Sequence, residues 1–381
     1  MALRVEERIV AGEDGDAIVV HHLVLHGSNR AIGRHLGDVA RARYHLAPAP
    51  AIDPLRARVQ REWLRRNAPV LFERMRGVAD AFRVDVGADG LDLSRLGAPP
   101  PTAGCSAIFL PPRATAVGHP LVSRAFDFAA PVAGRAPPGV APAASRPYVL
   151  ETHPDEGHAA LALVAFDLLG AALDGVNAEG LCVVAASDVE SPAAEPDPAG
   201  IGLDELQIGR VLLDSCATAQ EARELLLSAK HHYAAVPAHW LVADRHGDAF
   251  VFEVGPGRNR VHLVEARAEP LVLTNHPLHR YPADEALPRA AGPVGTYARY
   301  RLLRAALAEA LAPWRAEALG AVAERAFVGP AGCDRTLWHG VYDLAERSLE
   351  ATFFLRDEPD PARARGTRTV RTPALRFELQ A

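Results

Sequence analysis

The sequence predicts an α+β fold in which stacked β-sheets are flanked by helices. The chain has 381 residues, of which 49% are hydrophobic, so it can form one large domain or two medium ones. Apolar residues recur at helical spacing over residues 54–82, whereas short apolar runs typical of strands dominate after residue 104. This change of pattern indicates that most helices and most strands come from different parts of the chain.

The N-terminal part is predicted to be mostly helical. One short strand is expected at residues 17–25, a helix at 31–44 and a longer helical pattern at 54–82. Residues 94–104 are rich in Pro and Gly, which disfavours regular structure, and we expect them to be exposed. The character of the chain changes at this stretch.

The C-terminal part is predicted to consist mainly of strands, with helical patterns at 204–231 and 296–311. Two loops rich in Pro and Ala, 129–147 and 190–202, are expected to border a site. The expected strands are 105–110, 119–126, 146–152, 160–168, 180–186, 239–245, 248–254, 260–266, 271–275, 335–344 and 350–356.

The composition points to a small-molecule partner in the cytoplasm. The net charge of -6 is spread along the chain, which argues against nucleic acid and anionic membranes as partners. The charged start does not resemble a secretory signal, and no stretch is apolar for long enough to span a membrane. The four cysteines are too sparse for a disulfide framework, and Cys182 and Cys216 are expected to be core residues.

The pair Gly104-Cys105 is the main candidate for chemistry. If this peptide bond is cut, Cys105 carries both a thiol and a free α-amine, which are the nucleophile and the base that one residue can supply. An α-amine has a pKa of about 7.7 to 8.0, which suits general-base catalysis near neutrality. Arg124 and Asp127 follow three residues apart, and a bend or bulge after Arg124 is expected to bring both to one site.

Several motifs resemble those of penicillin V acylases and choloylglycine hydrolases, and most of all the branch containing isopenicillin-N N-acyltransferase (acyl-coenzyme A:6-aminopenicillanic acid acyltransferase). Cys105 after Gly104 resembles the family's nucleophile, and an internal cysteine behind a helical prosegment favours this branch. The other motifs, in chain order, are HGSNRAIGRHLG (26–37), MRGVADAF (75–82), SRAFDF (123–128), DGVNAEGL (174–181), LTNH (273–276) and TYARYRLL (296–303).

The resemblance implies an N-terminal-nucleophile fold, an αββα sandwich of two stacked antiparallel sheets between helical layers. It implies that Cys105 is the nucleophile, that Arg124 lies beside the thiol and that Asp127 holds the α-amine. It further implies that Asn275 donates to the oxyanion and that Arg299 is a second active-site arginine.

Three positions depart from the family pattern. The family's R-N-x-D element reads Arg124-Ala125-Phe126-Asp127 here, so Ala125 stands in place of its asparagine. Where related hydrolases place another oxyanion asparagine, this chain has Ser187, whose hydroxyl or backbone N–H could serve as the second donor. The usual Glu after Asn177 is shifted by one residue in NAEGL. Asn177 is a candidate pocket residue, although its spacing from Gly180 is more typical of a turn.

The resulting expectation is a self-processing enzyme that cleaves at Gly104-Cys105. Residues 1–104 would form a small helical subunit and residues 105–381 the catalytic subunit, and the two would stay together as an αβ heterodimer. No cofactor or metal is expected: the pairs His231-His232 and His276-x-x-His279 lack a carboxylate at ligand spacing, and Gly255-x-Gly257 is read as a hairpin turn.

The substrate side remains open between alternatives. The enzyme would hydrolyse linear amides, or it would transfer an acyl group, with acyl-coenzyme A as a further candidate substrate. A different class of function is a non-catalytic binding protein that retains the fold. Homo-oligomerisation is also left open by the sequence.

Overall fold

The computed structural model is an α+β protein, which confirms the fold class expected from the sequence. The two loops predicted at 129–147 and 190–202 lie largely outside the residues that the structure describes, as do Cys333 and Gly257. The described residues are 2–13, 15–97, 104–129, 146–191, 197, 199–255, 260–309, 313–329, 334–360 and 366–380.

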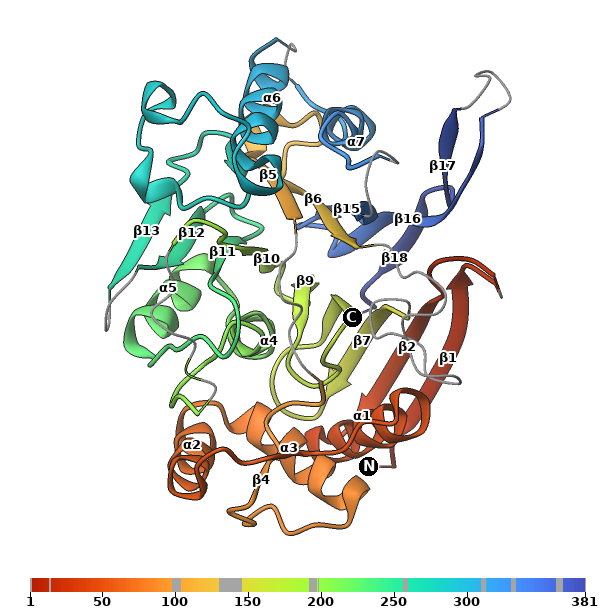
Figure 1. The fold of residues 1–381 in the computed structure, drawn as a ribbon, viewed down its shortest axis with the longest axis vertical. Coiled ribbons are helices and arrows are strands. Elements are labelled where there is room, and N and C mark those ends of the chain that lie inside the picture. The colour runs from red at the N-terminus through yellow and green to blue at the C-terminus, as the bar shows by residue number, and fades with distance from the viewer. Residues whose placement is uncertain are drawn as a thin grey trace.

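A large sheet runs through the middle of the molecule (Figure 1). In spatial order its described strands are β1 Arg4–Ala11, β2 Val20–Gly27, β7 Tyr148–Pro154, β8 Ala160–Val164, β9 Ala172–Asn177, β10 Cys182–Ser187, β11 Ala238–Ala243, β12 Ala249–Val254 and β13 Val261–Glu265. β2 and β7 run parallel, so the prediction of purely antiparallel sheets was wrong at this pair. A long connection through helices and other strands separates β2 from β7, and such a connection permits parallel pairing.

A small sheet packs against the large one and carries Cys105. Its described strands are β14 Leu271–Leu273, β5 Gly104–Leu110, β6 Leu121–Ala129, β15 Asp334–Asp343, β16 Ser348–Pro359 and β17 Thr367–Arg371, and β18 Leu375–Glu378 also pairs with β16. A separate two-stranded pair joins β3 Ala49–Pro50 to β4 Leu91–Asp92. The strands β1, β3, β4, β9, β17 and β18 were not predicted, since they are charged, short or interrupted by Gly.

The helical pattern predicted as one segment at 54–82 is two helices. The chain leaves the helical conformation at Ala68 because Pro69 disfavours helical geometry in the residue before it. Among the described residues, no helix combines the length and the apolar character that crossing a bilayer requires. The helices are α1 Asn29–Tyr44, α2 Pro54–Asn67, α3 Pro69–Phe82, α4 Gln207–Ser215, α5 Ala219–Ser228, α6 Thr296–Glu309 and α7 Ala316–Glu324, of which α7 was not predicted.

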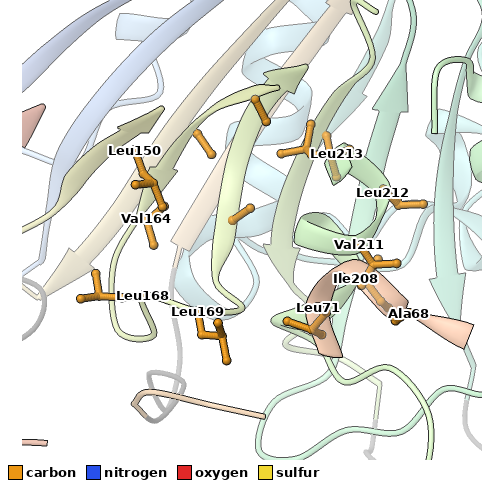
Figure 2. Packing of buried hydrophobic residues seen from close by; sticks show 14 of the residues in the cluster. Ala68, Leu71, Leu150, Val164, Leu168, Leu169, Ile208, Val211, Leu212 and Leu213 are labelled. Atoms are coloured by element: carbon orange, nitrogen blue, oxygen red, sulfur yellow. The ribbon is translucent and has the colours of Figure 1, made fainter. Parts of the chain in front are cut away.

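Three buried clusters define the order of the layers. The first lies between helices α1 to α5 and the large sheet, and Figure 2 shows Ala68 and Leu71 from the start of α3 beside Ile208 and Val211 of α4. The second fills the space between the two sheets and includes Cys105. The third lies between the small sheet and helices α6 and α7. The layers therefore follow the order helices, large sheet, small sheet, helices.

The helices α1 and α3 pack closely because glycines remove the side chains at their contact. A Cβ atom added to Gly33 would lie 2.0 Å from the carbonyl oxygen of Arg74, and one added to Gly77 would lie 2.0 Å from that of Arg30. Gly37 faces Ala81 in the same way. Gly33 and Gly37, which lie in the motif HGSNRAIGRHLG (26–37), thus have a packing role in this chain.

Candidate active site

Cys105 lies near the start of β5, the second strand of the small sheet, and belongs to the buried cluster between the two sheets. β5 pairs with β6 without any shift of register, so that Cys105 lies opposite Phe126 and Gly104 lies opposite Asp127. The predicted bend after Arg124 was wrong, because the register shift lies instead in β15, between Thr336 and Trp338. Residues contact Cys105 from both faces of the small sheet. Side chains on the face toward the large sheet approach the thiol, and side chains on the face toward α6 contact the main chain of Cys105.

The thiol of Cys105 is buried, with 2% of the residue exposed. Burial raises the pKa of this thiol, since a thiolate loses its hydration there. The positive charges of Arg124 and Arg299 and a backbone N–H of Ser187 lower the pKa in part, while the negative charge of Asp127 raises it further. The thiol therefore stays protonated near neutrality, and it needs a base at close range to become a nucleophile.

Arg124 contacts the thiol directly. Its Nη2 lies 3.5 Å from Cys105 Sγ and 3.4 Å from the carbonyl oxygen of Ala185. The guanidinium carbon lies 4.6 Å from the ring centre of Phe126, in a cation–π contact. Its Nε lies 2.8 Å from Asp174 Oδ2 on the large sheet, and neither side chain has exposed surface. Sequence reasoning missed Asp174, whose signal was a single carboxylate within the apolar run 171–176.

The main chain of Cys105 is held by residues of the LTNH and TYARYRLL motifs. The backbone N–H of Cys105 donates to Asn275 Oδ1 over 2.8 Å, and Arg299 Nη1 donates to the carbonyl oxygen of Cys105 over 2.7 Å. Arg299 Nη2 also donates to Asn275 Oδ1, at 2.6 Å. Thr296 fixes this loop, because its Oγ1 accepts from the backbone N–H of Asn275 over 2.8 Å. The site thus surrounds the backbone nitrogen of the nucleophile.

Asp127 lies on the opposite face of β6 from Arg124, beside Gly104. Its Oδ2 accepts from Arg299 Nη1 at 3.1 Å, and its Oδ1 accepts from the hydroxyl of Thr336 at 2.6 Å. A Cβ atom on Gly104 would lie 3.0 Å from the Cβ of Asp127 and 3.3 Å from its Oδ2. The carboxylate therefore borders the peptide bond that precedes Cys105.

Ser187 and Asn275 are joined through the main chain. Asn275 Nδ2 donates to the carbonyl oxygen of Ser187 over 2.8 Å, so the amide group of Asn275 bridges Ser187 and Cys105. The backbone N–H of Ser187 bonds the thiol and lowers its pKa. The structure thus brings together Cys105, Arg124, Asp127, Asn275, Arg299 and Ser187.

Asn177 lies in the turn between β9 and β10. Its Oδ1 accepts from the N–H groups of Glu179 and Leu181, at 3.1 and 3.0 Å. Its Nδ2 donates to the carbonyl oxygens of Leu213 and Cys216, at 3.0 and 2.7 Å. These bonds tie the turn to the end of α4.

A small pocket opens beside the thiol. Its polar lining comes from Cys105, Arg124, Ser187 and Glu205. The carboxylate of Glu205, which sequence reasoning missed, accepts from the N–H groups of Ala234, Ala235 and Val236 and so fixes one wall. The remaining lining residues are apolar: Phe126, Ala172, Leu173, Ala185, Ala186, Leu206, Val236 and Ala238.

The candidate histidine pairs do not gather into a metal site in the part of the chain that the structure describes. Within those ranges, no group of three or more His, Cys, Asp and Glu side chains is arranged to hold a metal ion. His276 is buried, and burial lowers its pKa to about 4. Its Nδ1 lies 2.9 Å from Thr296 Oγ1, which ties it to the loop that carries Asn275.

Comparison with solved structures finds distant similarities. Penicillin V acylase from Agrobacterium tumefaciens is 17% identical, with a TM-score of 0.45 over 65% of this chain and 82% of that chain. Two substituted forms of conjugated bile acid hydrolase from Clostridium perfringens are each 13% identical, with a TM-score of 0.48 over 71% of this chain and 97% of theirs. A comparison with curated protein sequences gives no match.

The sequence itself matches one family model, described as acyl-coenzyme A:6-aminopenicillanic acid acyl-transferase, over residues 140–318. This stretch includes Asn177, Ser187, Asn275 and Arg299, and it begins after Cys105. The motifs at 174–181, 273–276 and 296–303 all fall within it. The resemblance inferred from those motifs is therefore confirmed over residues 140–318.

Proposed function

We propose that this protein is a self-processing cysteine amidohydrolase or acyltransferase with an N-terminal-nucleophile αββα sandwich. The observation that carries the proposal is the contact of Asn275 and Arg299 with the backbone nitrogen and carbonyl of Cys105. A catalyst that uses the α-amine of its own nucleophile requires this kind of hold on the main chain. The order of the layers and the family match support the same conclusion.

The first step is cleavage at Gly104-Cys105. The thiol of Cys105 attacks the Gly104 carbonyl carbon, the C–N bond breaks, and the thiol proton ends on the nitrogen, which becomes the free α-amine. Water then hydrolyses the thioester, which leaves a carboxylate on Gly104 and a thiol on Cys105. Gly104 lacks a side chain, which suits its close packing against Asp127.

After cleavage, the α-amine of Cys105 acts as the base. It donates one hydrogen bond to Asn275 Oδ1, as the backbone N–H does in the structure, and its lone pair accepts the thiol proton. Asp127, next to the space that Gly104 occupies, and its partner Arg299 set the charge around this amine. The thiolate, beside Arg124, attacks the substrate carbonyl, and the ammonium returns the proton to the leaving amine.

The developing oxyanion needs donors near the thiol. The backbone N–H of Ser187 bonds the thiol itself, and we assign it as one donor. Asn275, predicted as a side-chain donor, directs its Nδ2 to the Ser187 carbonyl oxygen, so in this proposal it holds Ser187 in place. Water or an amine then takes the acyl group from the Cys105 thioester.

The two fragments of the processed protein would remain together as a heterodimer. The segment before residue 104 contributes β1 and β2 to the large sheet and packs α3 against α4. The buried pair Arg74–Asp214, with 2.8 Å between Nη1 and Oδ2, also joins the two segments. The pocket beside the thiol is mostly apolar, which favours an acyl group with an apolar body.

A panel of linear amides with apolar acyl groups tests this function. Wild-type protein is incubated with each amide, and with acyl-coenzyme A plus a free amine, while Cys105→Ala serves as the matched control. Release of amine identifies a hydrolase, and a new amide identifies a transferase. If neither product forms and a thiol-reactive acyl analogue labels Cys105 no faster than Cys182 and Cys216, the protein is a binding protein instead.

A further inference from the structure

Arg124, the side chain beside the thiol, reaches across from the small sheet to a carboxylate on the large sheet. Its Nε lies 2.8 Å from Asp174 Oδ2, and both side chains are fully buried. Nη2 of the same guanidinium lies 3.5 Å from Cys105 Sγ. One rigid planar group therefore joins the carboxylate to the thiol.

Asp174 is itself held firmly by two aromatic side chains of β15. Trp338 Nε1 donates to its Oδ2 over 3.2 Å, and the hydroxyl of Tyr342 donates to its Oδ1. Neither aromatic side chain has exposed surface. The carboxylate thus has a fixed position between the sheets, supported by donors from the sheet opposite its own.

The other contacts of Arg124 leave its position less well determined. The carbonyl oxygen of Ala185 lies 3.4 Å from Nη2, at the long end for a hydrogen bond, and the cation–π contacts with Phe126 and, at 5.6 Å, Trp338 permit sliding over the rings. A long guanidinium side chain has several rotatable bonds, and their entropy opposes a single position. A fixed carboxylate at Nε removes that freedom.

We propose that Asp174 is a positioning residue that holds the Arg124 guanidinium against the Cys105 thiol. This inference rests on the proposed function, in which that thiol becomes the nucleophile. Asp174 acts through Arg124 and does not itself contact the substrate. Its own negative charge works against a thiolate, so the positioning effect and the direct charge effect have opposite signs.

Because the positioning effect and the direct charge effect have opposite signs, the direction of the change in Asp174→Asn distinguishes between them. The substitution keeps the size of the side chain and removes its charge. Alkylation of Cys105 by iodoacetamide is followed from pH 5 to 10 by mass mapping of the peptide that contains Cys105. We expect the apparent thiol pKa to rise and the rate at pH 7 to fall about tenfold, as one unit of pKa implies.

Two other results would overturn the proposal. A faster reaction and a lower thiol pKa would mean that Asp174 acts as a nearby negative charge, and an unchanged rate would mean that Arg124 keeps its place without it. Asp214→Asn is the matched control, because it also breaks a buried Arg–Asp pair. This control should leave the alkylation rate of Cys105 unchanged. A fall in rate as large as that in Asp174→Asn would also refute the positioning role of Asp174.

A second comparison applies if Asp174→Asn does not fold, since it leaves a buried guanidinium without its counter-ion. Arg124→Gln is compared with the double variant Arg124→Gln/Asp174→Asn, which removes both charges. Without Arg124 only the direct charge effect of Asp174 remains, so the double variant is expected to react as fast as Arg124→Gln or faster, and a slower double variant would contradict positioning through Arg124. Alkylation needs no substrate, and the rates are compared between proteins that are either all cleaved or all uncut at Gly104-Cys105. A protein without amidase activity would therefore refute the proposed function but leave this test of Asp174 valid.

Discussion

The contact between α1 and α3 predicts a large loss of stability in Gly33→Ala. The added Cβ would lie 2.0 Å from the carbonyl oxygen of Arg74 and 2.6 Å from its Cα, both of which belong to the rigid backbone of α3. An ordinary carbon–oxygen contact is about 3.3 Å, so the helices must separate by about 1.3 Å. A gap of that size forfeits much of the dispersion energy along the interface.

The free energy can be estimated from two opposing effects. Overpacking of a rigid contact costs about 3 kcal/mol, at the upper end of the usual range. Replacing Gly by Ala inside a helix returns about 1 kcal/mol. We therefore expect Gly33→Ala to lower the free energy of unfolding by about 2 kcal/mol, measured by urea titration with circular dichroism.

Gly320→Ala in α7 is the matched control. Its added Cβ would meet only Cε1 of His339, at an ordinary 3.6 Å. Only the higher helix propensity of Ala relative to Gly then acts, and this variant should be more stable than wild type by about 0.5–1 kcal/mol. If both variants change stability in the same direction, the close approach of α1 and α3 does not control the effect, and the reasoning fails.

Two further predictions concern the site and its support. Gly104→Ala should slow self-processing about tenfold, because its Cβ would lie 3.0 Å from that of Asp127 and displace the scissile carbonyl; Gly90→Ala, with no atom within 4 Å of its Cβ, should process like wild type on a time course of intact mass. Glu253→Gln should destabilise the protein most between about pH 4.5 and 6.5. Burial raises the pKa of Glu253, but His239 and hydrogen bonds lower it more, to about 2, so its contribution exists above its ordinary pKa of 4.5 and is lost as pH falls toward 2. Burial lowers the pKa of His239, but Glu253 raises it more, so the net shift of this pKa is upward. The contribution of His239 to stability therefore exists below pH 6.5 and is lost as pH rises through the raised pKa. Urea unfolding of both proteins at pH 5.5 and 9 checks this, and an equal difference at both pH values would contradict it.

The sequence was informative where local pattern decides structure. The strand at Cys105 and the helix that carries Arg299 were expected close to their observed bounds, because apolar runs and helical spacing are local properties. The break at Ala68 was readable in principle from Pro69, but helical spacing of apolar residues continues across it. The edge strand β1 could not be recognised from the sequence, since charged residues occupy both of its faces.

The arrangement of the site depended on pairings between distant residues. Fifty positions separate Arg124 from Asp174, and no local pattern reports that two sheets bring them together. The expected bend after Arg124 assumed that Arg124 and Asp127 must lie on the same face of the strand to reach one site. In the structure, Asp127 lies instead beside the main chain of Gly104 and contacts Arg299 on the outer face of the sheet.

The central claim, that Cys105 becomes an N-terminal nucleophile, is tested most directly by intact mass under denaturing conditions. Wild-type protein and Cys105→Ala are purified in parallel and measured together. We expect two fragments for wild type, residues 1–104 and 105–381, and a single chain for the variant. A single uncut chain in both samples would contradict it, because Cys105 would then have no free α-amine to serve as its base.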